Sequence, residues 1–359
     1  MYIAPIRKLL YSISKAKLEK SKNVNKDGLK SSATVSVAPM MEWTDRHCRY
    51  LHRTISKNTL LYTEMLTAAA IVNGDKSKLL NFNEAEHPLA LQMGGSEPKL
   101  LANAVRIVEK WGYDEVNLNV GCPSEKVKSG SFGVVLMRSP HLVADCIKAM
   151  LDASQNVEIT LKCRIGVDED DPYVILPDFI EKMQSAGVGR LIIHARKAWL
   201  QGISPKQNRN LPPLDYNLIF KMKEIFPRMH LTINGGIQDI GEIKTHLSNG
   251  IDGVMVGRSA YHNPVHVLQK VDCEIYNMGV IKTGFEIVEV MLPYIEHHLK
   301  NGGRLNQITR HMLGIFSAQP GAKVWRRNIS EQAYKKDAGT DVLINALKSV
   351  VLAQKDSSS

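Results

Sequence analysis

The chain has 359 residues, of which 44% are hydrophobic and 23% are charged, and these values are typical of a globular protein. Its length is sufficient for one large domain and a smaller second one. No apolar run reaches the length of a membrane span, so we expect no membrane partner. The formal net charge of +10 is compatible with an anionic partner, although charge alone does not identify one.

The cysteines argue against a structural zinc site or a disulfide framework. They stand at positions 48, 122, 146, 163 and 273, and no two of them form a C-x-x-C pair. A metal site is therefore not expected, and a reducing compartment is favoured.

Residues 1–33 differ in composition from the rest of the chain. Their only acidic residues are Glu19 and Asp27, and their basic residues are Arg7, Lys8, Lys15, Lys17, Lys20, Lys22, Lys26 and Lys30. No sustained apolar segment follows the charges, which argues against a secretory signal. Two interpretations remain open, an organelle transit peptide and a disordered basic tail that adds affinity for polyanions. We expect a cytoplasmic protein, or a mitochondrial or plastid one if the leader is a transit peptide.

From residue 34 onward, short β-rich segments alternate with helical ones. The expected strands cover residues 34–38, 59–63, 89–93, 115–120, 157–163, 191–194, 229–233 and 253–256. Helical segments between them include 97–111, 140–153, 173–186 and 239–249. This alternation predicts parallel β-α units and hence an α/β fold class. Eight units predict a (β/α)8 TIM barrel over 34–275 rather than an open doubly wound sheet, because no G-x-G-x-x-G motif follows a strand.

Beyond Pro264 the alternation ceases and helical segments follow at 285–299, 305–317, 323–327 and 341–353. They predict a C-terminal all-α helical bundle over 283–355. Residues 304–336 hold one acidic residue, Glu331, and the basic residues Arg304, Arg310, Lys323, Arg326, Arg327, Lys335 and Lys336. A solvated basic face is the common reason for such a run, but the net charge favours a nucleic-acid contact surface.

The stretch from Asn117 to Ser124 carries the strongest signal of chemistry. A strand ends in two amides, Asn117 and Asn119, which share one face because side chains alternate along a strand. Cys122 follows in a loop between Gly121 and a proline. An isolated cysteine is often a buried structural one, but this position favours a presented thiol beside a planar polar ligand.

In a barrel of this kind, active sites lie at the C-terminal ends of the strands. The residues expected there form a polar and largely cationic ring: Pro39, Met40, Glu64, Gln92, Asn119, Lys162, Arg164, His194, Arg196, Asn234, Gly235, Gly236, Gly257 and Arg258. Alternation directs Cys163 away from this ring, so we expect it to be structural. The glycine pair at 235–236, followed by Arg258 at the next strand end, favours a phosphate site over a plain turn.

These residues together resemble the tRNA-dihydrouridine synthases, and specifically the A type. The stretches that carry the resemblance are VAPMMEWTDRHCRYLHR, LLYTEM, ALQMGGSEP, YDEVNLNVGCPSEKV, LKCRIG, IIHARKAWLQGISPKQNRNLPPLDY, INGGI, DGVMVGRSAYHNP and ITRHMLGIFSAQPGAKVWRR. They span the chain except for its leader. The leader is longer than bacterial A-type sequences need, and it suggests a eukaryotic host.

The resemblance implies an FMN-bearing barrel, a C-terminal helical tRNA-binding domain, and NADPH as the reductant. The expected reaction converts uridine in the D-loop of tRNA, at position 20 and 20a, to 5,6-dihydrouridine. A hydride from the flavin adds to C6, and Cys122 matches the cysteine that protonates C5. The family is usually monomeric.

The resemblance also assigns binding roles to the residues at the strand ends. Flavin contacts match Pro39, Met40, Gln92, Lys162 and His194, while the phosphate grip matches Asn234, Gly235, Gly236, Gly257 and Arg258. Asn119 matches a residue that orients the uracil edge, and Arg164 and Arg196 are placed to support carbonyls or phosphates. In the helical domain we expect Arg310, Arg326 and Arg327 to contact tRNA.

Two rival interpretations use much of the same machinery. One is an FMN-dependent reductase of a free pyrimidine or an enone, which would not need the basic helical domain. The other is a tRNA-binding protein without catalysis, against which Cys122, Asn119 and Lys162 argue.

Overall fold

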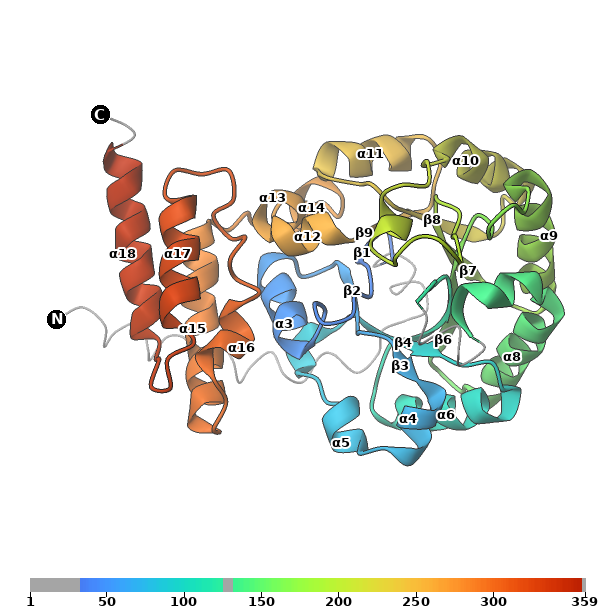
Figure 1. The fold of residues 1–359 in the computed structure, drawn as a ribbon, viewed down its shortest axis with the longest axis horizontal. Coiled ribbons are helices and arrows are strands. Elements are labelled where there is room, and N and C mark those ends of the chain that lie inside the picture. The colour runs from blue at the N-terminus through green and yellow to red at the C-terminus, as the bar shows by residue number, and fades with distance from the viewer. Residues whose placement is uncertain (1–32, 125–131, 357–359) are drawn as a thin grey trace.

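The computed structural model describes residues 33–124 and 132–356 (Figure 1). The expectations about the basic leader fall almost wholly outside these residues. So does most of the loop that follows Ser124.

Within the described residues, eight parallel strands close into a barrel, which confirms the predicted TIM barrel (Figure 1). The strands are β1 (Val35–Val37), β2 (Leu60–Tyr62), β4 (Leu89–Gly94), β5 (Glu115–Val120), β6 (Glu158–Arg164), β7 (Arg190–His194), β8 (His230–Asn234) and β9 (Gly253–Val256). Closure comes from the pairing of β9 with β1 and of β2 with β4. A further short strand, β3 (Leu66–Thr67), pairs with β4.

Helices surround the barrel because the loops between parallel strands must cross back over the outside. They are α3 (Arg46–Ile55), α4 (Ala68–Asn73), α5 (Lys76–Leu79), α6 (Pro98–Lys110), α8 (Pro140–Ala153), α9 (Pro172–Ser185), α10 (Tyr216–Ile225) and α11 (Ile240–Ser248). Short 3-10 segments occur at η1 (Glu84–Glu86), η2 (Gly133–Arg138) and η3 (Gln207–Arg209). In α6, a proline at the first turn starts the helix, and Leu101, Val105 and Val108 form its buried face.

The strands are buried on both faces, but the two faces differ in chemistry. On β5, Val116, Leu118 and Val120 pack into the apolar core between barrel and helices. Glu115 and Asn117 alternate with them, are fully buried, and form hydrogen bonds to other polar side chains inside the barrel. Cys163 lies in the outer core, as expected, and burial raises its pKa to about 12.

After β9, the chain forms α12 (Arg258–His262), α13 (Pro264–Leu268) and α14 (Val271–Glu274). The C-terminal helices then stand together beside the barrel (orange and red in Figure 1). They are α15 (Gly284–Lys300), α16 (Leu305–Thr309), α17 (Ala322–Gln332) and α18 (Asp341–Asp356). The fully buried Trp325 anchors α17: its indole N–H donates to the carbonyl of Met312 at 2.9 Å, and Phe316 packs at its edge.

The predicted helix over 305–317 is wrong in length, because α16 ends at Thr309. Beyond it, the backbone continues in turns with bonds such as Ile315 N–H to Met312 O, at 3.2 Å. Gly314 lies within these turns, and a Cβ at this position would lie 2.0 Å from the carbonyl oxygen of His262. The chain here packs directly on the end of α12, a tertiary contact that the local helical pattern does not reveal. The predicted helix over 323–327 is too short, since α17 has eleven residues.

Helix α3 connects the barrel to the C-terminal helices. Asp45 caps its N-terminus and also accepts from His311 Nε2 at 3.1 Å and from Arg310. Burial alone would raise the pKa of Asp45, but the hydrogen bond and charge of His311, together with hydrogen bonds from the Cys48 N–H and Arg310, hold the pKa well below its usual value. The Tyr50 ring stacks on Tyr294 of α15 with centroids 3.9 Å apart.

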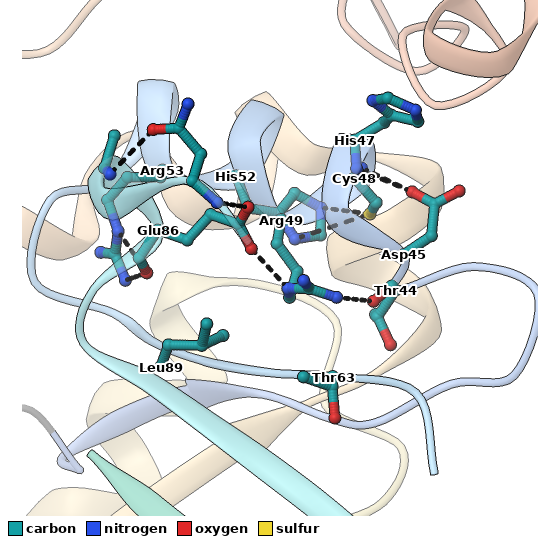
Figure 2. A network of polar contacts seen from close by, with 12 residues as sticks. Thr44, Asp45, His47, Cys48, Arg49, His52, Arg53, Thr63, Glu86 and Leu89 are labelled. Carbon is teal, nitrogen blue, oxygen red and sulfur yellow. Dashed lines mark hydrogen bonds and ion pairs between the residues drawn. The ribbon is translucent and has the colours of Figure 1, made fainter. Parts of the chain in front are cut away.

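The inner side of α3 is fixed to the barrel by a second set of polar contacts (Figure 2). Arg49 donates to the buried carboxylate of Glu86 at 2.7 Å. Arg53 donates to backbone carbonyls, including those of Glu86 and Thr59. Arg49 and Arg53 thus bond a buried carboxylate and backbone carbonyls of the barrel loops, and these bonds hold α3 beside the barrel. Among the described residues, no helix is both long and apolar enough to cross a membrane.

Candidate active site

A cavity of about 370 Å³ opens at the C-terminal ends of the strands. Its walls come from the ends of β1, β4, β5, β6, β7, β8 and β9 and from the loops that follow them. Every residue predicted to bind the cofactor lines this cavity: Pro39, Met40, Gln92, Lys162, His194, Asn234, Gly235, Gly236, Gly257 and Arg258. Cys122, Asn119 and Arg164 line it too.

Cys122 is half-buried, has a free thiol, and stands in the loop after β5. Its backbone N–H donates to Asn119 Oδ1 at 3.0 Å, and its carbonyl accepts from Val134 N–H at 3.0 Å. Its Sγ lies 3.5 Å from Ser124 Oγ. The loop therefore holds the thiol from both sides of its backbone and presents it to the cavity.

Lys162 and His194 each place a side-chain nitrogen at the cavity, and the two differ in charge. Lys162 Nζ donates to Asn234 Oδ1 at 2.9 Å. Burial, followed by the charge of Arg164, lowers the pKa of Lys162 to about 8. Burial and the charges of Arg164 and Lys162 hold the pKa of His194 well below its usual value. At neutral pH the lysine is thus largely a cation, while the histidine is a neutral donor or acceptor.

Arg164 fixes the loops around the thiol as well as lining the cavity. Its Nε donates to the carbonyl of Gly121 at 3.0 Å, next to Cys122. Its Nη1 donates to the carbonyls of Lys197 and Asn208, at 2.9 and 3.1 Å. The side chain is 3% exposed, and burial lowers its pKa to about 10. It remains a cation at neutral pH, so it adds positive charge beside the thiol.

The turn after β8 has the form of an anion cradle. Gly235 and Gly236 have φ values of +115° and +80°, which side-chain-bearing residues rarely adopt. A Cβ on Gly235 would lie 2.6 Å from His194, so only glycine allows this approach. Arg258 begins α12 after the neighbouring strand β9, and its guanidinium donates to Asn210 Oδ1 at 2.7 Å. Backbone curvature and a cation together form a donor set that suits a phosphate.

The structure does not bring four predicted substrate residues into this cavity. Arg196 donates to the carbonyls of Asn210 and Pro212 and does not line it. Arg310 pairs with Asp45 and lines a separate cavity of about 540 Å³ between the barrel and the C-terminal helices. Arg326 and Arg327 are exposed on α17.

Several residues that line the cavity were not predicted from the sequence. Trp43, Arg209 and Ser259 line the cavity, as do Met41 and Met65. The Trp43 ring stacks on Tyr261 of α12, with centroids 4.6 Å apart and an interplanar angle of 14°. The position of Trp43, a few residues after the first strand, could have predicted its place in the cavity wall. No feature of the sequence predicts that Arg209 lines the cavity, because it lies within the long 195–215 loop.

Asn117 also differs from its expected position. It does not line the cavity, because both ends of its amide are bonded inside the barrel, to Gln92 and Thr160. Asn119 alone of the two amides reaches the ligand side. Across the described ranges, no group of three His, Cys, Asp or Glu side chains is arranged to hold a metal ion.

The fold is a TIM barrel, and its C-terminal end holds an accessible thiol in a cationic pocket that suits a phosphate. These features are those of a TIM-barrel enzyme. The family model described as dihydrouridine synthase matches residues 36–351. The chain is 50% identical over 328 residues to the tRNA-dihydrouridine(20/20a) synthase of Shewanella oneidensis, covering 91% of this chain and 97% of that one. It is 52% identical over 321 residues to the protein of the same name from Escherichia coli K12, covering 89% and 92%.

The chain therefore belongs to the dihydrouridine synthase family. A solved structure of morphinone reductase in complex with tetrahydroNAD matches with a TM-score of 0.46 and 13% identity. It covers 64% of this chain and 84% of that one, and a likeness at this score supports no conclusion about function.

Proposed function

We propose that this protein reduces uridine at positions 20 and 20a of tRNA to 5,6-dihydrouridine. The observation that carries the proposal is the Cys122 thiol, which faces a cavity lined by Lys162, Arg164, Arg209 and Arg258. Relatives at about 50% identity, aligned over nearly their whole length, are named tRNA-dihydrouridine(20/20a) synthases. Hydride addition to a uracil ring develops negative charge on its carbonyls, and cations near a proton donor stabilise that charge.

FMN is the cofactor that the donor set suits. The glycine turn at Gly235 and Gly236, together with Arg258, would hold its phosphate, while Gln92 and Lys162 would contact its ring. When bound, FMN supplies the hydride for uracil C6, with NADPH as the reductant. The Lys162 cation would stabilise negative charge on the ring, and with its pKa lowered to about 8 it is still mostly protonated at neutral pH.

Cys122 would give its proton to uracil C5 as the ring accepts a hydride at C6. The thiol leaves this step as a thiolate and regains its proton from solvent before the next turnover. Arg164, which donates to the Gly121 carbonyl, lies where it stabilises that thiolate. Asn119 would orient the uracil edge through its amide N–H. Its Oδ1 is already occupied by the backbone N–H groups of Gly121 and Cys122.

The C-terminal helices, over 283–355, would serve as a tRNA-binding domain. Arg326 and Arg327 are exposed on α17, where they are available to backbone phosphates. Arg310 lies between this domain and the barrel, although its pairing with Asp45 makes it a weaker candidate. A uridine in a loop is already poorly stacked, so turning it out into the cavity costs only about a few kcal/mol.

The test is nucleotide-resolution mapping of dihydrouridine in unmodified tRNA after incubation with the protein, FMN and NADPH. We expect product at positions 20 and 20a and at no other uridine. Oxidation of NADPH with free pyrimidines or enones, and no product in tRNA, would contradict the proposal and favour a small-molecule reductase. Bound tRNA without any flavin would instead favour a binding protein.

A further inference from the structure

A chain of buried amides connects the interior of the barrel to the backbone of Cys122. Asn119 Oδ1 accepts from the backbone N–H groups of Gly121 and Cys122, both at 3.0 Å. Asn119 Nδ2 donates to Gln92 Oε1 at 2.8 Å, and Gln92 Nε2 donates to Asn117 Oδ1 at 2.8 Å. All three amide side chains belong to buried residues, with Asn117 at 0% exposure. The Asn117 end of the chain is thus closed to water, while Gln92 and Asn119 lie at the cavity wall.

The chain ends on a buried ion pair. Asn117 Nδ2 donates to Thr160 Oγ1 at 2.8 Å, and the Thr160 hydroxyl donates to Glu115. Arg190 donates to the other carboxylate oxygen of Glu115 at 2.5 Å, and Tyr62 OH donates to Glu115 at 2.6 Å. Burial raises the pKa of Glu115, and the charge of Arg190 opposes that rise. Arg190 is never deprotonated in a protein, so the carboxylate always faces a cation.

Strand register explains how these residues come into line. Gln92 on β4 stands opposite Asn117 on β5, and Asn117 stands opposite Thr160 on β6. Glu115, Asn117 and Asn119 lie two residues apart on β5, so all three project into the barrel. The connection thus follows directly from the parallel pairing of three neighbouring strands.

The two ends of the chain impose the same orientation on every amide between them. A carboxylate accepts hydrogen bonds only, so Thr160 directs its hydrogen to Glu115 and accepts from the Asn117 nitrogen. That leaves the Asn117 oxygen for Gln92. At the other end, two backbone N–H groups require the oxygen of Asn119, which leaves its nitrogen for Gln92. An amide turned by 180° would place donor against donor on one side and acceptor against acceptor on the other, so the hydrogen bonds on both sides would be lost.

We propose that Asn117, Thr160 and Glu115 are positioning residues that set the orientation of Asn119 and thereby the backbone of the Cys122 loop. A second consequence concerns the ligand: the side-chain oxygens of Gln92 and Asn119 are used within the chain, so these two residues offer N–H donors to the cavity. The pair then suits a ligand edge that carries carbonyl oxygens. The inference rests on the proposed function, because it concerns the thiol that would protonate uracil.

The test compares three variants of the FMN-loaded protein. Thr160→Val keeps the shape of the side chain and removes the hydroxyl that connects Asn117 to Glu115. Thr160→Ser restores that hydroxyl. Tyr62→Phe is the matched control, because it removes a buried hydroxyl from the same carboxylate without interrupting the chain to Asn119. Thr160→Ala replaces Thr160→Val if the latter does not fold by its thermal unfolding curve.

Two readouts are needed. The first is the rate of Cys122 alkylation by iodoacetamide, followed by peptide mass spectrometry, with the half-buried Cys273 as the internal reference. The second is the turnover number for dihydrouridine formation in tRNA. We expect Thr160→Val to change the Cys122 alkylation rate at least threefold and to lower turnover on the order of tenfold. Thr160→Ser should recover both, Tyr62→Phe should affect neither, and Cys273 should react equally in all forms.

Three results would overturn the inference: unchanged alkylation of Cys122 in Thr160→Val, equal impairment in Thr160→Ser, or the same effects in Tyr62→Phe. The alkylation comparison does not depend on the reaction. If the wild-type protein formed no dihydrouridine, the proposed function would fail while alkylation still decided the role of Thr160.

Discussion

The two ends of the barrel interior hold their charges in opposite ways. At the N-terminal end, the guanidinium of Arg190 bonds to both Glu115 and Glu158, at 2.5 and 2.9 Å. At the C-terminal end, the cavity is lined by Lys162, Arg164, Arg209 and Arg258, with Glu42 as the one carboxylate among the described lining residues. At the first end the cation is paired with carboxylates of the same chain, whereas at the second end four cations face a single carboxylate. A difference of this kind separates a structural clamp from a site that receives an anionic ligand.

The largest expected effect is the loss of activity on removing the Cys122 thiol while the rest of the cavity stays intact. Cys122→Ala should retain flavin binding and lower dihydrouridine formation by at least about 100-fold, because a general acid contributes a factor of roughly 10² to 10⁴. Single-turnover assays on tRNA and the visible flavin spectrum check the two halves of this statement. Cys273→Ala, in α14 outside the cavity, is the matched control and should behave as wild type. Equal activity of Cys122→Ala would remove the acid role.

The second prediction concerns the ion pairs of Arg190 at the N-terminal end of the barrel interior. Arg190→Met leaves the Glu115 carboxylate buried without its cation, which should lower the free energy of unfolding by about 3–5 kcal/mol. Urea denaturation followed by circular dichroism measures this. Lys182→Ala, which removes a partly exposed pair with Asp178, should cost less than about 1 kcal/mol. Similar losses of unfolding free energy in both variants would show that the buried ion pair stabilises the fold no more than the partly exposed one.

The third prediction tests the basic surface outside the barrel. The double variant Arg326→Ala and Arg327→Ala should weaken tRNA binding about tenfold and reduce the slope of log K against log salt by roughly 0.7–0.9 for each phosphate that is no longer neutralised. Filter binding over a salt series measures both quantities. Lys110→Ala on α6 is the control, and flavin binding should stay constant in both proteins. An unchanged salt slope would exclude these arginines from the tRNA contact surface.

The smallest expected effect concerns the pH dependence of the cationic end. The pKa of Lys162 is lowered to about 8, so its charge disappears as pH rises through that value. Affinity for FMN, an anion, should therefore fall several-fold between about pH 7 and 9, because the cation is present below the pKa and absent above it. Fluorescence titration of the flavin follows this. Lys162→Met should bind more weakly at pH 7 and show a flatter profile. A wild-type profile that rises with pH would contradict the assignment.

Periodicity and spacing in the sequence determined the barrel and most of its active end. Each of the eight expected strands coincides with a barrel strand to within about two residues, since local β-rich runs between helices need no tertiary information. Parallel strands in register bring their C-terminal ends together, so reading those ends also located Lys162, His194 and Asn234 in one cavity. The outward direction of Cys163 likewise follows from alternation alone.

Only the tertiary structure decided what depends on partners far apart in the chain. Arg196 and Arg310 read as free cations in the sequence, but carbonyls of the 195–215 loop hold the first and Asp45 holds the second. The early end of α16 and the close contact of Gly314 with α12 also appear only in the folded chain. The orientation of Asn119 depends on Glu115, through hydrogen bonds across three strands. Local sequence fixes the face on which a side chain lies, whereas its hydrogen-bond partners are set by whichever strands and loops the closed barrel brings within reach.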